Sequence, residues 1–204
     1  MIHNIIFDWS GTLVDDFSCV LAATNNLFSA FGRPEMSAFE FRAKFRLPFM
    51  DFYAENLPEI SEEQLEEVYH KYFAAIQKNI CLLPGARRML EFCKATGRRL
   101  YLLSTVRKTF FELKAQELGI SHSFDQAYTG VLDKRVKIHE VLATHHLDPH
   151  ETAFIGDMVH DIEAAQRGGV WSVAVLTGFD PLEKLALAAP DLVARNLEAF
   201  CAFL

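Results

Sequence analysis

The sequence feature that most constrains the fold is a series of short, uninterrupted apolar runs separated by helical patterns. Such runs are typical of strands buried on both faces of a parallel sheet, because half-exposed strands alternate apolar and polar residues. Five stretches fit this description, of which the third is the weakest: residues 4–8, 99–104, 126–130, 152–156 and 170–176.

Helical patterns occupy the intervals around the later runs. They cover residues 86–96, 108–118, 136–145 and 161–167. The first two stop at Gly97 and Gly119, which agrees with the frequent use of glycine just past a helix end. Strands that alternate with helices at this spacing predict βαβ units, so we expect an α/β fold with a doubly wound parallel sheet.

The interval from about residue 15 to residue 82 breaks this rhythm and contains no convincing strand. Residues 19–31 have helical spacing, and residues 37–55 resemble two short helices divided by Pro48. Ser61 and Gln64 resemble a capping box that opens a helix reaching about residue 79. We therefore expect a helical domain of residues 15–82 inserted into an α/β core domain of residues 1–14 and 83–204.

Composition narrows the class of protein. A chain of 204 residues can bury one substantial core with a smaller appendage. A net charge of −7 argues against non-specific binding of nucleic acid, which needs a concentrated basic surface. No apolar run reaches the roughly 18 residues of a membrane span, and no basic leader precedes the first run. The four cysteines form no CxxC pair. We expect reduced thiols in a cytoplasmic protein, either a monomer or a homodimer.

Acidic residues follow two of the predicted strands. Asp8 ends the first run, and Asp157 ends the run at residues 152–156, with Asp161 four residues further on. Ligands of open parallel sheets collect at the carboxyl ends of the strands. Because Mg²⁺ prefers a few carboxylates with water and a substrate phosphate, these residues predict a magnesium site.

Hydroxyl and basic residues follow two other strands. Ser104 and Thr105 offer hydroxyls and backbone N–H groups near the start of a helix, which suits a phosphate. Lys134 lies in a basic segment after the weak strand and can hold a carboxylate beside a phosphate. A carboxylate such as Asp8 can attack phosphorus to give an aspartyl-phosphate.

Four motifs in order resemble the haloacid dehalogenase (HAD) superfamily of hydrolases, in its phosphoglycolate-phosphatase-like branch. FDWSGTLVDD is similar to the first motif of that family, LLSTV to the second, Lys134 to the third and GDMVHD to the fourth. LLPGARRMLEFCKATGRRLYLLS resembles the segment that leads into the second motif, and the helical insert matches the position of the branch's cap domain. The resemblance spans nearly the whole chain.

The resemblance implies roles for the candidate residues. The metal site would comprise Asp8, which is also the nucleophile, the backbone carbonyl of Ser10, Asp157 and Asp161. The family's activity would be the Mg²⁺-dependent hydrolysis of a small phosphorylated metabolite.

The resemblance also implies that Ser104 binds the transferring phosphoryl group and that Lys134 neutralises charge. Lys137 is the rival for the latter role. We prefer Lys134 because it precedes the helix that Val136 is expected to begin.

The first motif departs from the family pattern at Ser10. In phosphatases of this family, the residue at this position is an acid that protonates the leaving oxygen. Such proton transfer raises the rate roughly 10²–10⁴-fold. Four interpretations remain open: a phosphatase that is slow on alkyl phosphates, a phosphonatase-like enzyme that uses a cap lysine (Lys44, Lys71 or Lys78), a dehalogenase, or a silent binding protein. The dehalogenase is disfavoured because those enzymes need no metal, whereas Asp157 and Asp161 are retained.

The insert carries candidates for substrate recognition. Arg42, Lys44 and Arg46 are interleaved with aromatic residues, and we expect the first two to bind an anionic substrate. The aromatic residues are expected to form the core of the insert: Phe39, Phe41, Phe45, Phe49, Phe52 and Tyr53. Several histidines of the second half of the chain show no metal-site spacing, and only His160 lies inside a motif, GDMVHD.

Overall fold

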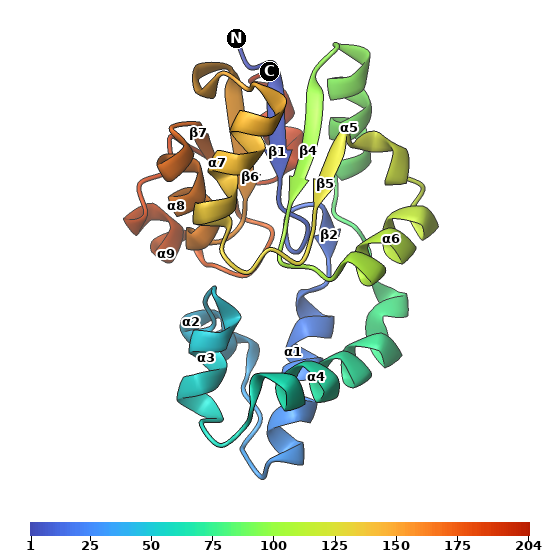
Figure 1. Cartoon of the computed structure of the whole chain (residues 1–204), viewed down its shortest axis with the longest axis vertical. Helices are drawn as coiled ribbons and strands as arrows, with labels where there is room; N and C mark the ends of the chain where they lie inside the picture. Colours follow the sequence, from blue (N-terminus) through green and yellow to red (C-terminus); the bar gives the residue numbers. More distant parts are fainter. The chain divides into compact units, whose positions relative to one another are not determined.

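The computed structural model describes all of residues 1–204 (Figure 1), which divide into two compact units. The first comprises Met1–Asp15 and Cys81–Leu204, and the second comprises Asp16–Ile80. We call them the α/β unit and the helical unit.

A six-stranded parallel sheet forms the centre of the α/β unit, with the strand order β5-β4-β1-β6-β7-β8. The strands are β1 (Asn4–Phe7), β4 (Arg99–Leu103), β5 (Gln126–Tyr128), β6 (Thr152–Gly156), β7 (Trp171–Val175) and β8 (Leu192–Ala194). β1 lies in the middle, where Ile5 is opposite Leu100 on one side and Ala153 on the other. All four residues of β1 are buried, which explains its uninterrupted apolar sequence.

Helices surround this sheet (Figure 1). They are α5 (Ala86–Ala95), α6 (Lys108–Glu117), α7 (Lys134–His145), α8 (Val159–Gly168), α9 (Leu182–Leu187) and α10 (Leu197–Cys201). On one face, Ile138 of α7 and Ala164 of α8 pack in a buried cluster with Ile6 and Tyr101 of the sheet. A short antiparallel pair, β2 (Val14–Asp15) with β3 (Cys81–Leu82), joins the two points where the chain leaves and re-enters this unit. The predicted doubly wound α/β fold is confirmed.

The element boundaries differ in places from those predicted. α7 begins at Lys134 rather than at Val136, so Lys134 is the first residue of the helix and does not precede it. α8 begins at Val159, and Asp161 therefore lies within its first turn. Several short elements were not predicted, namely β8, α9, α10 and the β2–β3 pair.

The helical unit contains α1 (Phe17–Ala30), α2 (Ala38–Lys44), α3 (Phe49–Asn56) and α4 (Glu62–Ile76), followed by a 3₁₀ turn at Gln77–Asn79. The predicted capping box of Ser61 and Gln64 is present at the start of α4, and a second one joins Ser37 and Glu40 at the start of α2. Both boxes satisfy N–H groups that the first turn of a helix leaves without partners.

Aromatic side chains fill the core of the helical unit. Phe41, Phe45, Phe52 and Tyr53 are buried, with the rings of Phe41 and Phe45 stacked at 4.7 Å between centroids. Phe39 is 82% exposed, so its inclusion in the predicted core was wrong. It lies near the start of α2, where its side chain faces away from the buried side of the helix that Phe41 occupies.

Candidate active site

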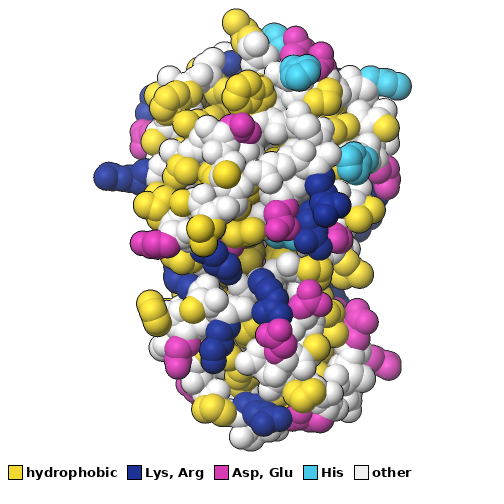
Figure 2. Space-filling model, turned by 90° about the vertical axis from the view of Figure 1, so that its left-hand side faces the viewer, with side chains coloured by type: hydrophobic (Ala, Val, Ile, Leu, Met, Phe, Trp, Pro, Cys, Tyr) yellow, Lys and Arg dark blue, Asp and Glu magenta, His cyan; other side chains and the backbone are white.

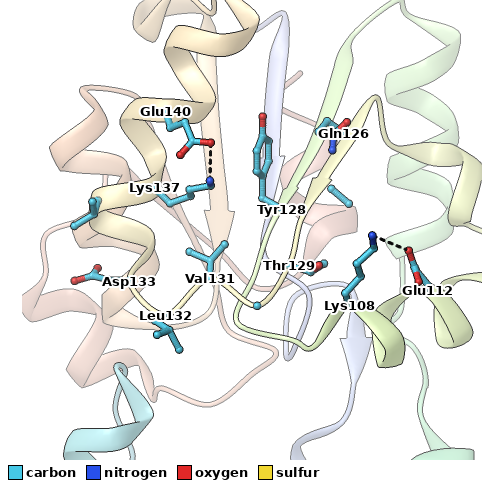
Figure 3. A pocket seen from close by; sticks show the side chains of 13 residues that line it. Lys108, Glu112, Gln126, Tyr128, Thr129, Val131, Leu132, Asp133, Lys137 and Glu140 are labelled. Carbon is cyan, nitrogen blue, oxygen red and sulfur yellow. Dashed lines mark hydrogen bonds and ion pairs between the residues drawn. The ribbon is translucent and has the colours of Figure 1, made fainter.

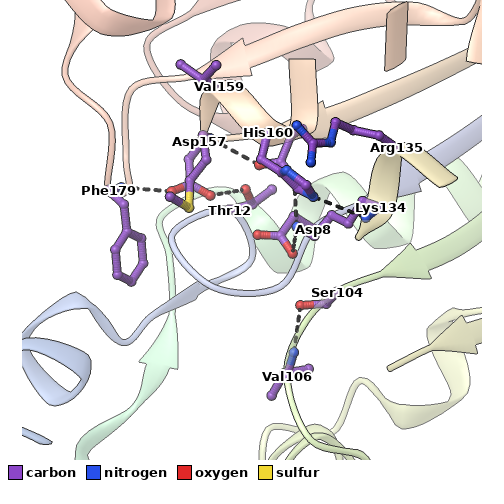
Figure 4. A network of polar contacts seen from close by, with 12 residues as sticks. Asp8, Thr12, Ser104, Val106, Lys134, Arg135, Asp157, Val159, His160 and Phe179 are labelled. Carbon is purple, nitrogen blue, oxygen red and sulfur yellow. Dashed lines mark hydrogen bonds and ion pairs between the residues drawn. The ribbon is translucent and has the colours of Figure 1, made fainter. Parts of the chain in front are cut away.

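Three buried carboxylates meet at the carboxyl edge of the sheet (Figure 4). Asp8 follows β1 and Asp157 follows β6, the neighbouring strand, so the parallel sheet brings them together. Asp161 projects from the first turn of α8. Their carboxylate oxygens lie within 4.8 Å of one another, and none of the three residues is more than 3% exposed. The structure thus brings together the three acids that the sequence indicated.

Lys134 supplies a positive charge within this acid cluster. Its side chain is fully buried, and Nζ lies 2.7 Å from Asp8 Oδ1 and 2.6 Å from Asp161 Oδ1. Burial would lower the pKa of Lys134, but the carboxylates of Asp161 and Asp8 outweigh it and raise that pKa. The ammonium group is therefore charged. Lys137 instead points to Glu140, with Nζ 2.6 Å from Oε1, so the structure brings Lys134 and not Lys137 to Asp8.

Two loops hold the carboxylate of Asp157. Oδ1 accepts a hydrogen bond from the Thr12 hydroxyl and Oδ2 accepts one from the Phe179 N–H, both at 2.8 Å. Gly11 has a φ of +69°, and a Cβ there would lie 2.5 Å from Asp157 Oδ2. A Cβ at Gly178 would lie 1.9 Å from the same oxygen. Only residues without a side chain allow both loops to approach the carboxylate this closely.

The loop after β7 also helps to hold Asp157, which no sequence pattern had indicated. Thr177 in that loop donates its hydroxyl to the carbonyl of Gly11 at 2.7 Å, which links it to the loop after β1. Asp180 accepts a hydrogen bond from the Val159 N–H at 2.7 Å and so satisfies a free N–H group at the start of α8. The segment 176–180 carries no recognisable motif, and only the sheet topology places it beside Asp157.

The acid cluster has the electrostatic character of a cation site. Burial raises the pKa of Asp8, with Asp161 adding to the shift and Lys134 opposing it. Burial, followed by the charges of Asp8 and Asp161, raises the pKa of Asp157 well above its usual value. Lys134 Nζ lies 2.7 Å from the buried Oδ1 of Asp8, so one ammonium faces a carboxylate of this cluster. Three carboxylates with one ammonium suit a hard divalent cation such as Mg²⁺.

Ser10 lies in the loop between β1 and β2, two residues after Asp8. It forms an isolated bridge with Val14, and the Leu13 and Val14 N–H groups donate to the Trp9 carbonyl at 2.9 and 3.1 Å. This tight turn fixes the backbone of the loop. Trp9 itself is buried and packs edge-on against Phe111, at 5.0 Å between ring centroids, which is a packing role.

Ser104 directly follows β4, the other neighbour of β1, and is buried at the same edge of the sheet. Its hydroxyl accepts the Val106 N–H at 3.3 Å (Figure 4). Thr105 follows and is half-buried. The parallel pairing of β4 with β1 therefore brings Ser104 to the strand end that carries Asp8.

The candidate substrate-binding residues Arg42 and Lys44 belong to α2 of the helical unit. The Arg42 guanidinium lies over the Phe17 ring, 3.9 Å from its centroid, and Lys44 is exposed. Arg46 pairs with Glu55, so its charge is already matched within this unit.

His160 is buried beside the acid cluster, on α8. Its Nε2 accepts a hydrogen bond from the Lys134 backbone N–H at 3.1 Å. Burial and the charges of Lys134 and Arg135 lower the pKa of His160 to about 4. The sequence had indicated His160 only by its place in GDMVHD.

A pocket of about 850 Å³ lies elsewhere in the α/β unit, along the edge strand β5 (Figure 3). Lys108, Tyr128 and Lys137 are among its lining residues, and none of the three clustered acids reaches it. The pocket is therefore separate from the acid cluster.

Together, these features define an α/β protein with a buried, acid-rich candidate active site at the carboxyl edge of a doubly wound sheet. Residues 5–175 match the family described as haloacid dehalogenase-like hydrolase. The chain belongs to this family of hydrolases, which confirms the resemblance drawn from the motifs. No helix of the structure combines the length and the apolar character that crossing a membrane requires.

Two similar proteins and one similar solved structure agree with this assignment. The chain is 27% identical to a phosphoglycolate phosphatase of Synechococcus elongatus over 190 residues, covering 92% of this chain and 90% of the relative. It is 25% identical to phosphoglycolate phosphatase 1 of Pseudomonas aeruginosa, covering 95% and 76%. A haloacid dehalogenase-like hydrolase from Streptococcus pneumoniae has a similar structure, with a TM-score of 0.84, 28% identity and coverage of 99% and 98%.

Proposed function

We propose that this protein is a Mg²⁺-dependent phosphatase that hydrolyses a small phosphorylated metabolite through an aspartyl-phosphate at Asp8. The observation that carries the proposal is the ion pair of Asp8 with Lys134, at 2.7 Å, inside a buried group of three carboxylates. The similarity to two phosphoglycolate phosphatases supports a substrate of this size and chemistry. On the face shown in Figure 2, basic side chains are interspersed with acidic ones, which also favours a small substrate over a nucleic acid.

Four groups would hold the metal: the carboxylates of Asp8, Asp157 and Asp161, and the backbone carbonyl of Ser10. Bound Mg²⁺ reduces the repulsion between an anionic nucleophile and an anionic phosphate. The cluster suits such an ion because its buried negative charge exceeds what Lys134 alone can balance.

Asp8 performs the covalent chemistry. A carboxylate oxygen attacks phosphorus, the bond between phosphorus and the ester oxygen breaks, and the ester oxygen leaves with the electron pair and takes a proton from water, because Ser10 supplies no acid. Water then attacks phosphorus, the bond to Asp8 breaks, and inorganic phosphate leaves with the Asp8 carboxylate restored. Burial raises the pKa of Asp8, and the ammonium of Lys134 opposes this rise, which favours the ionised form that acts as the nucleophile.

The phosphoryl group is bound at the neighbouring strand end. Ser104 follows β4, which pairs with β1, so its hydroxyl lies at the strand end beside Asp8. Ser104 and Thr105 bind phosphoryl oxygens in this proposal, and Lys134 offsets their charge. The helical unit acts as a cap that excludes water and selects the substrate, with Arg42 and Lys44 as its anion-binding candidates.

A phosphate-release assay tests the proposal. Acetyl phosphate, p-nitrophenyl phosphate and 2-phosphoglycolate are the probes, each with Mg²⁺ and with EDTA. We expect Mg²⁺-dependent release by the wild type and background release by Asp8→Asn. Asp148→Asn, which alters an exposed acid of the same unit, is the matched control and should keep wild-type activity. Release that persists in Asp8→Asn would exclude Asp8 as the nucleophile.

Ser10 favours one competing function, a binding protein of the same fold without turnover. Such a protein would bind Mg²⁺ and phosphate but release no product from any probe. The phosphonatase-like alternative would need Lys44, Lys71 or Lys78, which are all exposed residues of the helical unit, to form a Schiff base with the substrate.

A further inference from the structure

We propose that His160 is a positioning residue, which fixes the place of Lys134 beside Asp8 by accepting the hydrogen bond of the Lys134 backbone N–H. The proposal deepens the function proposed above and rests on the role given there to Lys134.

The hydrogen bond fills a gap at the start of α7. Lys134 is the first residue of that helix, and the first N–H groups of a helix have no partner within it. The capping residue Asp133 uses its side chain for the Arg135 N–H, at 2.9 Å. The Lys134 N–H is buried and instead donates to Nε2 of His160 at 3.1 Å.

This bond is the single hydrogen bond of the His160 ring. Nε2 accepts a hydrogen bond and therefore carries no proton itself. We assign the neutral tautomer, with the proton on Nδ1. Asp133 Oδ1 lies 3.5 Å from Nε2, which has no proton to donate to it. Nδ1 is buried and has no hydrogen-bond partner in the protein. An unsatisfied buried donor is unfavourable for folding, so stability alone does not account for an imidazole here.

His160 and the next residue, Asp161, hold the two ends of Lys134. His160 binds its backbone N–H, and Asp161 Oδ1 accepts from its Nζ at 2.6 Å. A lysine side chain has several rotatable bonds, so the ammonium is fixed relative to Asp8 only while its backbone is fixed too. A displacement of about 1 Å in such a group can lower a rate by about 10²-fold.

Two amide substitutions of different length test the proposal. The carbonyl of His160→Gln can occupy the place of Nε2, whereas the carbonyl of His160→Asn is one bond shorter and cannot reach the Lys134 N–H. His139→Asn, an exposed histidine of α7, is the matched control. The first readout is kcat on acetyl phosphate with Mg²⁺. The second is the ¹⁵N-bound proton signal of the Lys134 ammonium in the metal-free protein, assigned with Lys134→Arg.

We expect His160→Asn to lower kcat at least tenfold and to shift or broaden the Lys134 signal. His160→Gln should stay within about threefold of wild type, with the signal in place, and His139→Asn should change neither readout. Equal behaviour of the Gln and Asn variants in both readouts would overturn the proposal. If the wild type shows no turnover, the proposed phosphatase function fails, while the Lys134 signal still decides the positioning role of His160.

Discussion

At position 10 the chain carries a hydroxyl where proton transfer to a leaving alcohol would need a carboxylate. The other titratable groups of the acid cluster have their own partners: Lys134 pairs with Asp8 and Asp161, and Asp157 accepts two hydrogen bonds. At the scale of single residues, Ser10 is therefore the position at which a substitution should add chemistry rather than remove it.

We expect Ser10→Asp to raise kcat on an alkyl phosphate such as 2-phosphoglycolate by about 10²-fold, because a carboxyl group can protonate the leaving oxygen. Acetyl phosphate should gain little, since its leaving group needs no proton. Steady-state phosphate release on both substrates measures the effect. Ser10→Asn, which has a similar shape but no acid, should give no gain. Equal gains with Asn would show that proton transfer is not the cause.

Asp157 gives a prediction on stability. Its pKa is raised, so the native state binds a proton more tightly than the unfolded state does. The proton bound to Asp157 contributes to the stability of the folded state below the unfolded pKa of about 3.9. This contribution is lost as the pH rises through the folded pKa. In EDTA, Asp157→Asn should therefore be more stable than wild type at pH 8, and this advantage should shrink as the pH falls toward 4.

Urea unfolding of both proteins across this pH range measures the difference. The comparison cancels the other titrating groups, including His160, whose lowered pKa acts in the opposite direction. Excess Mg²⁺ at pH 8 should reverse the order, because an ion that binds only the native wild type stabilises it. A variant that is less stable than wild type in EDTA at pH 8 would contradict the raised pKa.

At the scale of elements, two loops determine how Asp157 is presented. The loop after β1 and the loop after β7 both lie against its carboxylate, and the Thr177 hydroxyl joins them. Neither loop binds through a charged side chain, so the site depends on backbone shape as much as on the acids themselves.

Gly178→Ala tests this dependence. A Cβ at position 178 would lie 1.9 Å from Asp157 Oδ2, a distance that forces the loop or the carboxylate to move. We expect at least a tenfold loss of Mg²⁺ affinity, measured by calorimetry, with far-ultraviolet circular dichroism unchanged. Thr177→Val, which removes the link between the loops without adding bulk near Asp157, should have a smaller effect. Wild-type affinity in Gly178→Ala would mean that the loop does not constrain the carboxylate.

Elements with long, regular patterns were predictable from the sequence, and short ones were not. The buried strands around β1 and the helices that follow them have strong signals, because each buries a continuous apolar face. β8 and α10 have three and five residues, too few to establish a period. Asp8 and Asp157 were predictable because each directly follows a strand, and Asp161 because it lies four residues after Asp157 in GDMVHD. Gly178 and Phe179, by contrast, contact Asp157 only through the tertiary fold.

At the scale of the whole molecule, the chain passes between its two units only twice, at Asp15–Asp16 and at Ile80–Cys81. Each unit has its own buried core, formed by aromatic rings in the helical unit and by sheet and helices in the α/β unit. We therefore expect the two units to open separately.

Hydrogen exchange of paired cap variants measures this. Ser61→Ala removes the capping box of α4, and Asn196→Ala removes the side chain that accepts the Ala199 N–H in α10. Each should cost its own unit about 1 kcal/mol. Amides of α4 should exchange several-fold faster only in Ser61→Ala, and amides of α10 only in Asn196→Ala. Faster exchange throughout both units in either variant would indicate a single cooperative molecule.

The central position of β1 also affects synthesis on the ribosome. Asn4 contacts Arg99, 95 positions later, and Thr152, 148 positions later. The strand that carries Asp8 is thus translated before its sheet partners, which follow only after the whole helical unit has emerged. Until then its apolar residues lack a core, while the helical unit can form from nearby contacts. Nascent chains that pause before β6 should thus depend most on chaperones.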